Sequence, residues 1–262
     1  MGSIFADAIG DFRDGLSRWR VWVALASEDI GDQHKRTTLG PMWLLLNYLA
    51  FAGTFILIFR RGEGIPHYET YVAVGLFVWL YMSEAITQSV SLFVREENFI
   101  KGTTLPLSVY VMRLTMQSAI RGGYMLAGCL ALLAVVGTSL SVGWLWAVLG
   151  LLVIALTTPA AITVFAMGGA FFPDLQFVVQ NVMRLGLFLT PIFWTVGSGG
   201  GVRRILADWN SFSYYLAIVR DPVMTGGIPL TAFGICLAIG AVLWLTAFLL
   251  MGLFRRQIVF VL

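Results

Sequence analysis

The chain has 262 residues, a net charge of +3 and a sequence pI near 9.0; 58% of its residues are hydrophobic and 12% are charged. With a mean hydropathy of +0.84, too few polar side chains remain to cover a soluble domain, which argues against a soluble enzyme or binding module. The basic residues gather at the ends of apolar runs, so they indicate membrane topology and not nucleic-acid binding.

Residues 3–23 predict an amphipathic helix lying on the membrane surface. Apolar side chains recur there at steps of four and three and so share one helical face. They are Phe5, Ile9, Phe12, Leu16, Trp19 and Val23. Arg13, Arg18 and Arg20 lie off that face, where their charged heads can reach lipid phosphates. A helix packed on a soluble partner has the same pattern, and this alternative stays open.

Six apolar segments follow, each about long enough to cross a hydrocarbon core of roughly 30 Å at about 1.5 Å per residue. The predicted fold is therefore an all-α integral membrane protein of six transmembrane helices in a single domain, residues 1–262. Most Lys and Arg residues outside the spans fall on the side of the membrane that holds the N-terminus. Because cytoplasmic flanks carry the excess of these residues, both termini are predicted to be cytoplasmic, in a bacterial inner membrane. The predicted spans are residues 40–59, 71–94, 107–136, 143–165, 177–196 and 230–254.

Residues 197–229 form the longest connection between predicted spans. Their apolar run, which includes Trp209, Tyr214 and Tyr215, is too short to cross a membrane and too apolar for an ordinary hydrated loop. Short re-entrant or interfacial helices on the outer side are the prediction.

The sequence lacks the residues of the usual catalytic and nucleotide sites. Neither Lys35 nor Lys101 is followed by Ser or Thr, so no phosphate-binding loop of the G-x-x-x-x-G-K-[ST] form exists. His34 and His67 lie in predicted loops, and Glu84 is the only acidic residue in a predicted span, so neither a general base with an orienting partner nor a metal cluster can be assembled. We expect no enzyme activity, no metal and no cofactor bound by this chain.

Glu84 nevertheless needs a physical explanation, because ionisable groups within a span face the bundle interior or a hydrated cavity. Gln88 lies four residues further on the same helical face, and Arg113, Arg121 or Arg184 could supply the counter-charge. The pattern fits a hydrated conduit or a structural ion pair, and both readings stay open. Trp79 and Tyr81, deeper than the interfacial aromatics, fit either a conduit along which a sugar chain slides or packing within the bundle.

Four local motifs, in order along nearly the whole chain, carry a family resemblance. They are the basic, then Leu-Gly-Pro-x-Trp, segment 35–43; Asn98-Phe-Ile-Lys101 followed by Leu105-Pro106; Leu189-Thr-Pro-Ile-Phe-Trp194; and Asn210 through Arg220-Asp-Pro222. Together they resemble the membrane subunits of type-2 ABC exporters, especially those moving lipid-linked polysaccharides such as O-antigen. Two positions depart from the family pattern: Ser211 replaces a common Pro, and Thr104-Leu105-Pro106 replaces a Phe-Pro step.

The resemblance implies partners and site residues. It implies a coupling helix in contact with an ABC ATPase subunit that binds ATP and Mg, two copies of that ATPase, and a homodimer of this chain with the conduit at its interface. The coupling-helix residues are Glu96, Glu97, Asn98, Phe99, Ile100 and Lys101. The conduit and outer-gate residues are Trp79, Tyr81, Glu84, Phe193, Trp194, Trp209, Tyr214 and Tyr215. Arg13, Arg18 and Arg20 would contact a lipid diphosphate, or only anchor the helix.

The function expected from the resemblance is that of the transmembrane subunit of an ATP-driven exporter, which moves a lipid-linked, O-antigen-like polysaccharide across the bacterial inner membrane. Three alternatives remain: an exporter of a small lipid or drug with the same fold, a membrane-bound glycotransferase using a lipid phosphate, and a passive channel.

Overall fold

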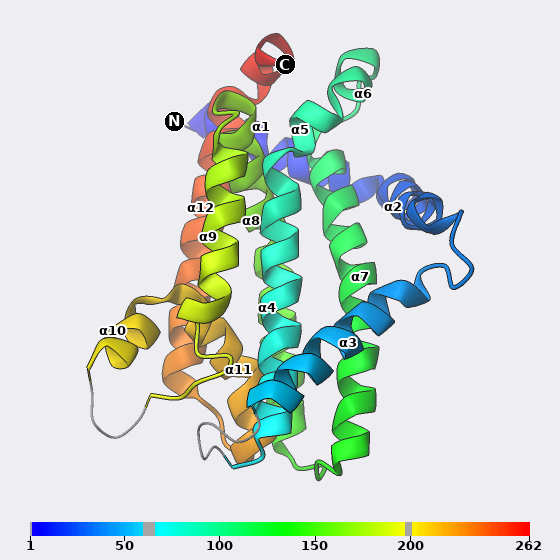
Figure 1. The fold of residues 1–262 in the computed structure, drawn as a ribbon. Coiled ribbons are helices and arrows are strands. Elements are labelled where there is room, and N and C mark those ends of the chain that lie inside the picture. The colour runs from blue at the N-terminus through cyan, green and yellow to red at the C-terminus, as the bar shows by residue number, and fades with distance from the viewer. Residues whose placement is uncertain (1, 60–65, 197–200) are drawn as a thin grey trace.

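The computed structural model describes residues 2–59, 66–196 and 201–262 (Figure 1). Within these ranges the regular structure is α-helical throughout, which confirms the all-α prediction. The helices are α1 (Gly2–Ser17), α2 (Trp19–His34), α3 (Met42–Phe59), α4 (Tyr68–Val90), α5 (Leu92–Arg95), α6 (Glu97–Gly102), α7 (Leu107–Val136), α8 (Gly143–Phe171), α9 (Leu175–Leu189), α10 (Val202–Trp209), α11 (Ser211–Thr225) and α12 (Leu230–Val261).

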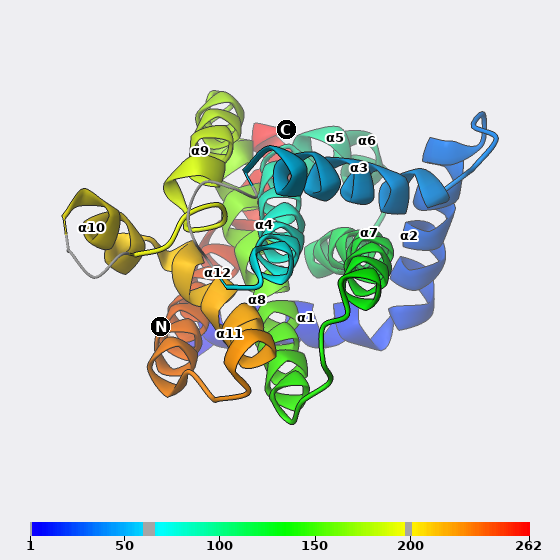
Figure 2. The same ribbon diagram turned by 60° about the horizontal axis from the view of Figure 1, so that its bottom comes forward.

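Four of these helices, α4, α7, α8 and α12, are long and apolar enough to cross a membrane. The other two predicted spans correspond to shorter apolar helices, α3 and α9. In both views α3 runs obliquely across α4 and α7 (Figures 1 and 2). The structure therefore supports four of the six predicted spans by length and composition.

The starts of α7, α8 and α12 match the predicted spans, but several ends differ. α4 ends at Val90 and not at residue 94, α12 continues to Val261 and not to residue 254, and α9 ends early. The third predicted span coincides with α7, and α8 begins at Gly143 as predicted but continues to Phe171. The prediction that the fifth span reaches residue 196 is wrong, because α9 ends at Leu189 and Thr190 is extended. Pro191 explains the early end, since proline lacks an N–H and disfavours helical backbone at the residue before it.

The N-terminal segment also differs from its prediction. A single helix over residues 3–23 is wrong: α1 ends at Ser17, the backbone breaks at Arg18 (φ −90°, ψ 32°), and α2 continues to His34. The two helices diverge: α1 packs on both α12 and α7, whereas α2 lies alongside α7 (Figure 2).

The bundle has two distinct ends. Both termini, α1, α5 and α6 lie at one end, at the top of Figure 1, which we name the hairpin end. The connection 137–142 and much of α11 lie at the opposite, far end. The main core joins α4, α7, α8 and α11 with buried residues of α3, α9 and α12. A second core at the hairpin end joins α1, α5, α6, α7, α8 and α12. Close packing of α8 on α11 requires a glycine, because a Cβ at Gly150 would overlap the carbonyl oxygen of Ile218.

Candidate functional site

The α5–α6 hairpin contains the six residues predicted to contact an ATPase. Phe93 and Ile100 are buried in the core at the hairpin end, so the hairpin is fixed to the bundle by its apolar side. Phe99 is 48% exposed, and the Lys101 Nζ atom lies 2.7 Å from Glu97 Oε1 in an exposed ion pair of the same helix. An exposed aromatic ring flanked by an exposed ion pair is a suitable docking point for another protein.

Arg113 of α7 connects the α5–α6 hairpin to α2. Its Nε donates to Asp29 Oδ2 at 2.6 Å and its Nη2 to Asp29 Oδ1 at 2.7 Å, a bidentate geometry. Its Nη1 donates to Glu96 Oε2 at 2.8 Å, and the Gln117 amide donates to Asp29. Arg113 thus joins α7 simultaneously to α2 and to the residue that begins the coupling helix.

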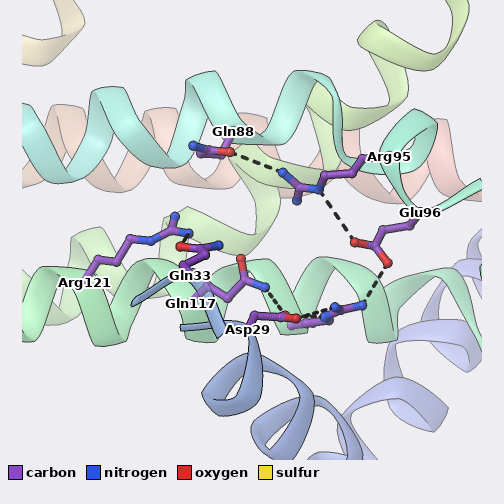
Figure 3. Close-up of polar contacts among 8 residues, drawn as sticks. Asp29, Gln33, Gln88, Arg95, Glu96, Gln117 and Arg121 are labelled. Atoms are coloured by element: carbon purple, nitrogen blue, oxygen red, sulfur yellow. Dashed lines mark hydrogen bonds and ion pairs between the residues drawn. The ribbon is translucent and has the colours of Figure 1, made fainter. Parts of the chain in front are cut away.

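Arg95 continues this polar network to α4. Its Nη1 donates to Gln88 Oε1 at 3.3 Å, and its Nε lies 3.6 Å from Glu96 Oε1 (Figure 3). Two arginines and two carboxylates, Arg95, Arg113, Asp29 and Glu96, balance in charge, which reduces the cost of withdrawing them from water. Sequence reasoning missed Asp29, although Asp29 and Gln33 are four residues apart and share one helical face.

Glu84 pairs with Arg121, one of its three predicted partners. Arg121 Nη1 lies 3.1 Å from Glu84 Oε1, an ion pair by distance that lacks hydrogen-bond angles. Arg121 Nη2 donates to Gln33 Oε1 at 3.1 Å, so α2 also supports this pair. Arg113 is not a partner of Glu84, because Asp29 and Glu96 engage it.

An open cavity of about 440 Å³ lies between α4 and α9, and we name it the α4/α9 trough. Arg184 in this trough is exposed and makes no ion pair or hydrogen bond with any residue that the structure describes. The lining residues are Trp79, Ser83, Glu84, Thr87, Gln88, Gln180, Met183, Arg184 and Leu187.

Only part of the predicted conduit reaches the trough. Trp79 lines it but is 2% exposed, its ring in edge contact with Phe212 at 5.1 Å and beside Gly186 of α9. Tyr81 faces the other way, with its hydroxyl 3.1 Å from Thr158 Oγ1. The structure thus brings Trp79 and Glu84 together in the trough and leaves Tyr81 outside it.

The predicted gate residues have separate surroundings. Phe193 stacks on Phe55 of α3 with centroids 4.2 Å apart, and the Trp194 indole donates to Phe188 O at 2.9 Å. Trp209 is 87% exposed. The Tyr214 hydroxyl donates to Asp208 O at 2.8 Å, and Tyr215 is buried with its hydroxyl 3.5 Å from Cys236 O.

A group of side chains that sequence reasoning did not single out holds the turn after α9. Arg220 Nη1 donates to Pro191 O at 2.6 Å, and its guanidinium lies 3.9 Å from the centre of the Tyr71 ring. The Tyr71 hydroxyl lies 2.9 Å from both Pro191 O and Trp194 O. We name this arrangement the far-end clasp. Both parts of this group belong to motifs that carry the family resemblance, residues 189–194 and 210–222. Those motifs were the signal in the sequence, and the structure shows that they contact each other.

Asn210 completes the clasp. Its Nδ2 donates to Thr190 Oγ1 at 2.7 Å, and its Oδ1 accepts from Phe212 N at 3.0 Å, which caps α11. One side chain therefore fixes both the end of α9 and the beginning of α11.

The N-terminal helix α1 is attached to the bundle by one face and leaves another exposed. Ala8 and Phe12 of α1 are buried, whereas Ile9 and Leu16 are about half exposed, as is Trp19 at the start of α2. An apolar stripe thus remains available for lipid at this end of the bundle.

Arg13, Arg18 and Arg20 are all exposed, with the Arg20 guanidinium 5.5 Å from the centre of the Trp19 ring. Asp11 accepts from Ser108 N at 3.0 Å and so caps α7, whose own N-cap is Pro106. Further along, a hydrogen bond to Asp32 raises the pKa of the exposed Lys35 ammonium. Among the residues that the structure describes, no group of three His, Cys, Asp or Glu side chains could hold a metal ion.

Comparison with known proteins identifies relatives. No protein-family model matches the chain. Two O-antigen export system permease proteins RfbA of Klebsiella pneumoniae are 28% and 26% identical over 178 and 210 residues, which cover 66% and 78% of this chain and 68% and 80% of the relatives. A protein of the same name from Myxococcus xanthus is 22% identical over 182 residues, 67% of this chain and 68% of its own. With the four long apolar helices, these similarities identify a multi-pass membrane protein and confirm its predicted resemblance to the permease subunits of type-2 ABC exporters of the O-antigen class.

Proposed function

We propose that this chain is the transmembrane subunit of an ATP-driven exporter that moves a lipid-linked, O-antigen-like polysaccharide across the bacterial inner membrane. The names of its relatives support the transported class, and the four long apolar helices support a transport pathway through the bilayer. In this proposal the chain is not an enzyme: a separate ATPase subunit, in two copies, binds ATP and Mg.

The observation that carries the proposal is the anchored hairpin with its exposed ring. Phe99 offers an ATPase an apolar contact, while Glu96 at the start of the same helix is bonded to Arg113. Because Arg113 also binds Asp29, a displacement of the hairpin would reach α7 and α2 together. A membrane subunit that is moved by a separate ATPase needs such a rigid connection between the hairpin and the membrane helices.

The proposed topology has six spans in one domain, with the hairpin end and both termini in the cytoplasm. α3, with 18 residues, and α9, with 15, are about 27 Å and 22 Å long, so in this proposal their flanking residues would complete the crossing of a hydrocarbon core of about 30 Å. Each of the six helices would then cross once, and α10 and α11 would lie at the outer side.

A homodimer would enclose the conduit. The face of α9 carrying Val182, Leu185 and Phe188 is exposed and apolar, and the α4/α9 trough opens beside it. A second copy placed there would convert the open trough into a lined pathway, with Trp79 and Glu84 on its wall. The segment 197–229, of which residues 197–200 lie outside the described residues, would be its outer gate. Arg13, Arg18 and Arg20 would contact the lipid diphosphate at the cytoplasmic surface.

The test is co-purification of this chain with its ATPase subunit. We expect stoichiometric recovery with the wild-type chain and at least tenfold less with Phe99→Asp, because a carboxylate replaces the apolar contact. Leu140→Asp is the matched control, since Leu140 is 84% exposed in the connection 137–142 at the far end, and it should leave recovery unchanged. A wild-type chain that recovers no ATPase, or that transports glycan without ATP, would refute the proposal.

A further inference from the structure

Arg184 is an unusual residue for its place in the fold. It lies in the tenth position of α9, an apolar helix whose exposed neighbours include Val182, Leu185 and Phe188. An arginine at membrane depth is costly, and such residues normally pair with a carboxylate or face a hydrated pathway. Arg184 has no partner among the described residues, and it lines the α4/α9 trough.

The charge of the trough follows from the pairing of its other ionisable residue. Among the described residues that line the trough, Glu84 is the only acidic one, and Arg121 neutralises it from α7 at 3.1 Å. Arg184 therefore leaves the trough with one uncompensated positive charge. An anion that entered would gain the attraction of Arg184 without first having to displace an internal carboxylate.

The neutral members of the lining supply hydrogen bonds around that charge. Gln180 lies one helical turn before Arg184 on the same side of α9. Across the trough, Arg95 donates to Gln88 Oε1, which leaves the Gln88 amide nitrogen free to donate to a ligand. Guanidinium and amide donors facing one space are the groups that bind phosphate and carboxylate oxygens.

The lining of the trough extends along α4 from the hairpin end toward the middle of the bundle. Gln88 lies two residues from the hairpin end of α4, and Trp79 lies nine residues deeper, roughly 14 Å along the helix. The polar lining thus leads from the hairpin end to about the middle of a bilayer. The trough is separate from α1, which carries Arg13 and packs on α12 and α7.

We propose that the α4/α9 trough binds an oxyanion of the transported glycolipid, a phosphate or a carboxylate, with Arg184 as the charged contact and Gln180 and Gln88 as hydrogen-bond donors. The inference rests on the proposed function for the identity of the glycolipid. The oxyanion has two possible sources, the diphosphate of the lipid carrier and an acidic sugar of the glycan.

The experiment measures binding to the chain purified with its ATPase, in nanodiscs, by native mass spectrometry. The probes are undecaprenyl diphosphate, the uncharged undecaprenol and an oligogalacturonate. Arg184→Gln should weaken binding of at least one anionic probe by tenfold or more and leave undecaprenol unchanged, whereas Arg184→Lys should retain most of the affinity. Loss confined to undecaprenyl diphosphate assigns the oxyanion to the carrier, and loss confined to oligogalacturonate assigns it to the glycan.

Arg204→Gln is the matched control, because Arg204 belongs to α10, away from the trough, and its side chain is 68% exposed. If wild type and Arg184→Gln bind both anionic probes equally well, the proposed anion site in the trough is wrong. Recovery of the ATPase is recorded in the same preparations. A wild-type chain that recovers no ATPase would overturn the proposed function. A complete complex in which Arg184→Gln leaves the binding of both anionic probes unchanged would overturn only the proposed anion site in the trough.

Discussion

Arg113 and Asp29, 84 residues apart in the sequence, form two parallel hydrogen bonds of 2.6 and 2.7 Å between α7 and α2. Their side chains are 13% and 23% exposed, so the pair is largely withdrawn from solvent. Because Glu96 binds the same guanidinium, one arginine connects the proposed coupling helix to two other elements. Stability and coupling should therefore depend on this residue more than on any exposed charge nearby.

Replacing Arg113 by Met should destabilise the protein by about 2 to 4 kcal/mol, because Asp29 and Glu96 lose their partner while partly buried. The free energy of unfolding, from a denaturant titration in detergent, checks this. Lys101→Met is the control: it breaks only the exposed pair with Glu97, which should cost at most about 1 kcal/mol. Equal, small losses in both variants would show that the Arg113 contacts contribute little.

Tyr71→Phe should loosen the far-end clasp. The variant keeps the ring under the Arg220 guanidinium but removes the hydroxyl that contacts Pro191 O and Trp194 O. We expect a loss of about 1 to 2 kcal/mol and faster hydrogen exchange confined to residues 190–196 and the adjoining start of α11. Tyr214→Phe, which removes a single hydroxyl contact to Asp208 O, should leave exchange at residues 190–196 unchanged. Unaltered exchange there in Tyr71→Phe would contradict the clasp.

Gly150→Ala should weaken the contact between α8 and α11. A Cβ at this position would overlap the carbonyl oxygen of Ile218, and backbone cannot move aside as a side chain can. The expected loss is about 1 to 3 kcal/mol. Gly123→Ala in α7 is the matched control, because a Cβ there meets nothing within 4 Å, so it should be neutral or stabilise by up to about 1 kcal/mol. Thermal unfolding of the two variants in the same detergent distinguishes them.

Hydropathy predicted the elements whose limits depend on local composition. The predicted third span matches α7, and the predicted starts at Gly143 and Leu230 match α8 and α12, because polar or turn-forming residues interrupt the apolar runs there. α9 was predicted too long because its apolar run continues past Pro191, a stop signal that the sequence did contain.

The contacts between distant segments could not be predicted in the same way. The pairing of Arg113 with Asp29 depends on the break at Arg18, which redirects α2 along α7, and no residue there is an obvious helix breaker. Similarly, sequence reasoning offered three arginines for Glu84, and only the packing of α4 on α7 selects Arg121 and leaves Arg184 without a partner among the described residues.

The proposed six-span topology predicts opposite labelling across single helices. Cys129 and Cys236 are buried, so single cysteines introduced at exposed positions can be labelled above a low background. In intact cells with a permeabilised outer membrane, an impermeant maleimide should label Leu140→Cys and Trp209→Cys. It should label Thr104→Cys and Phe172→Cys only after lysis, because α7 separates Thr104 from Leu140 and α9 separates Phe172 from Trp209. Labelling of Phe172→Cys and Trp209→Cys from the same side would mean that the 15-residue helix α9 does not cross the membrane, and it would remove α9 from the proposed conduit.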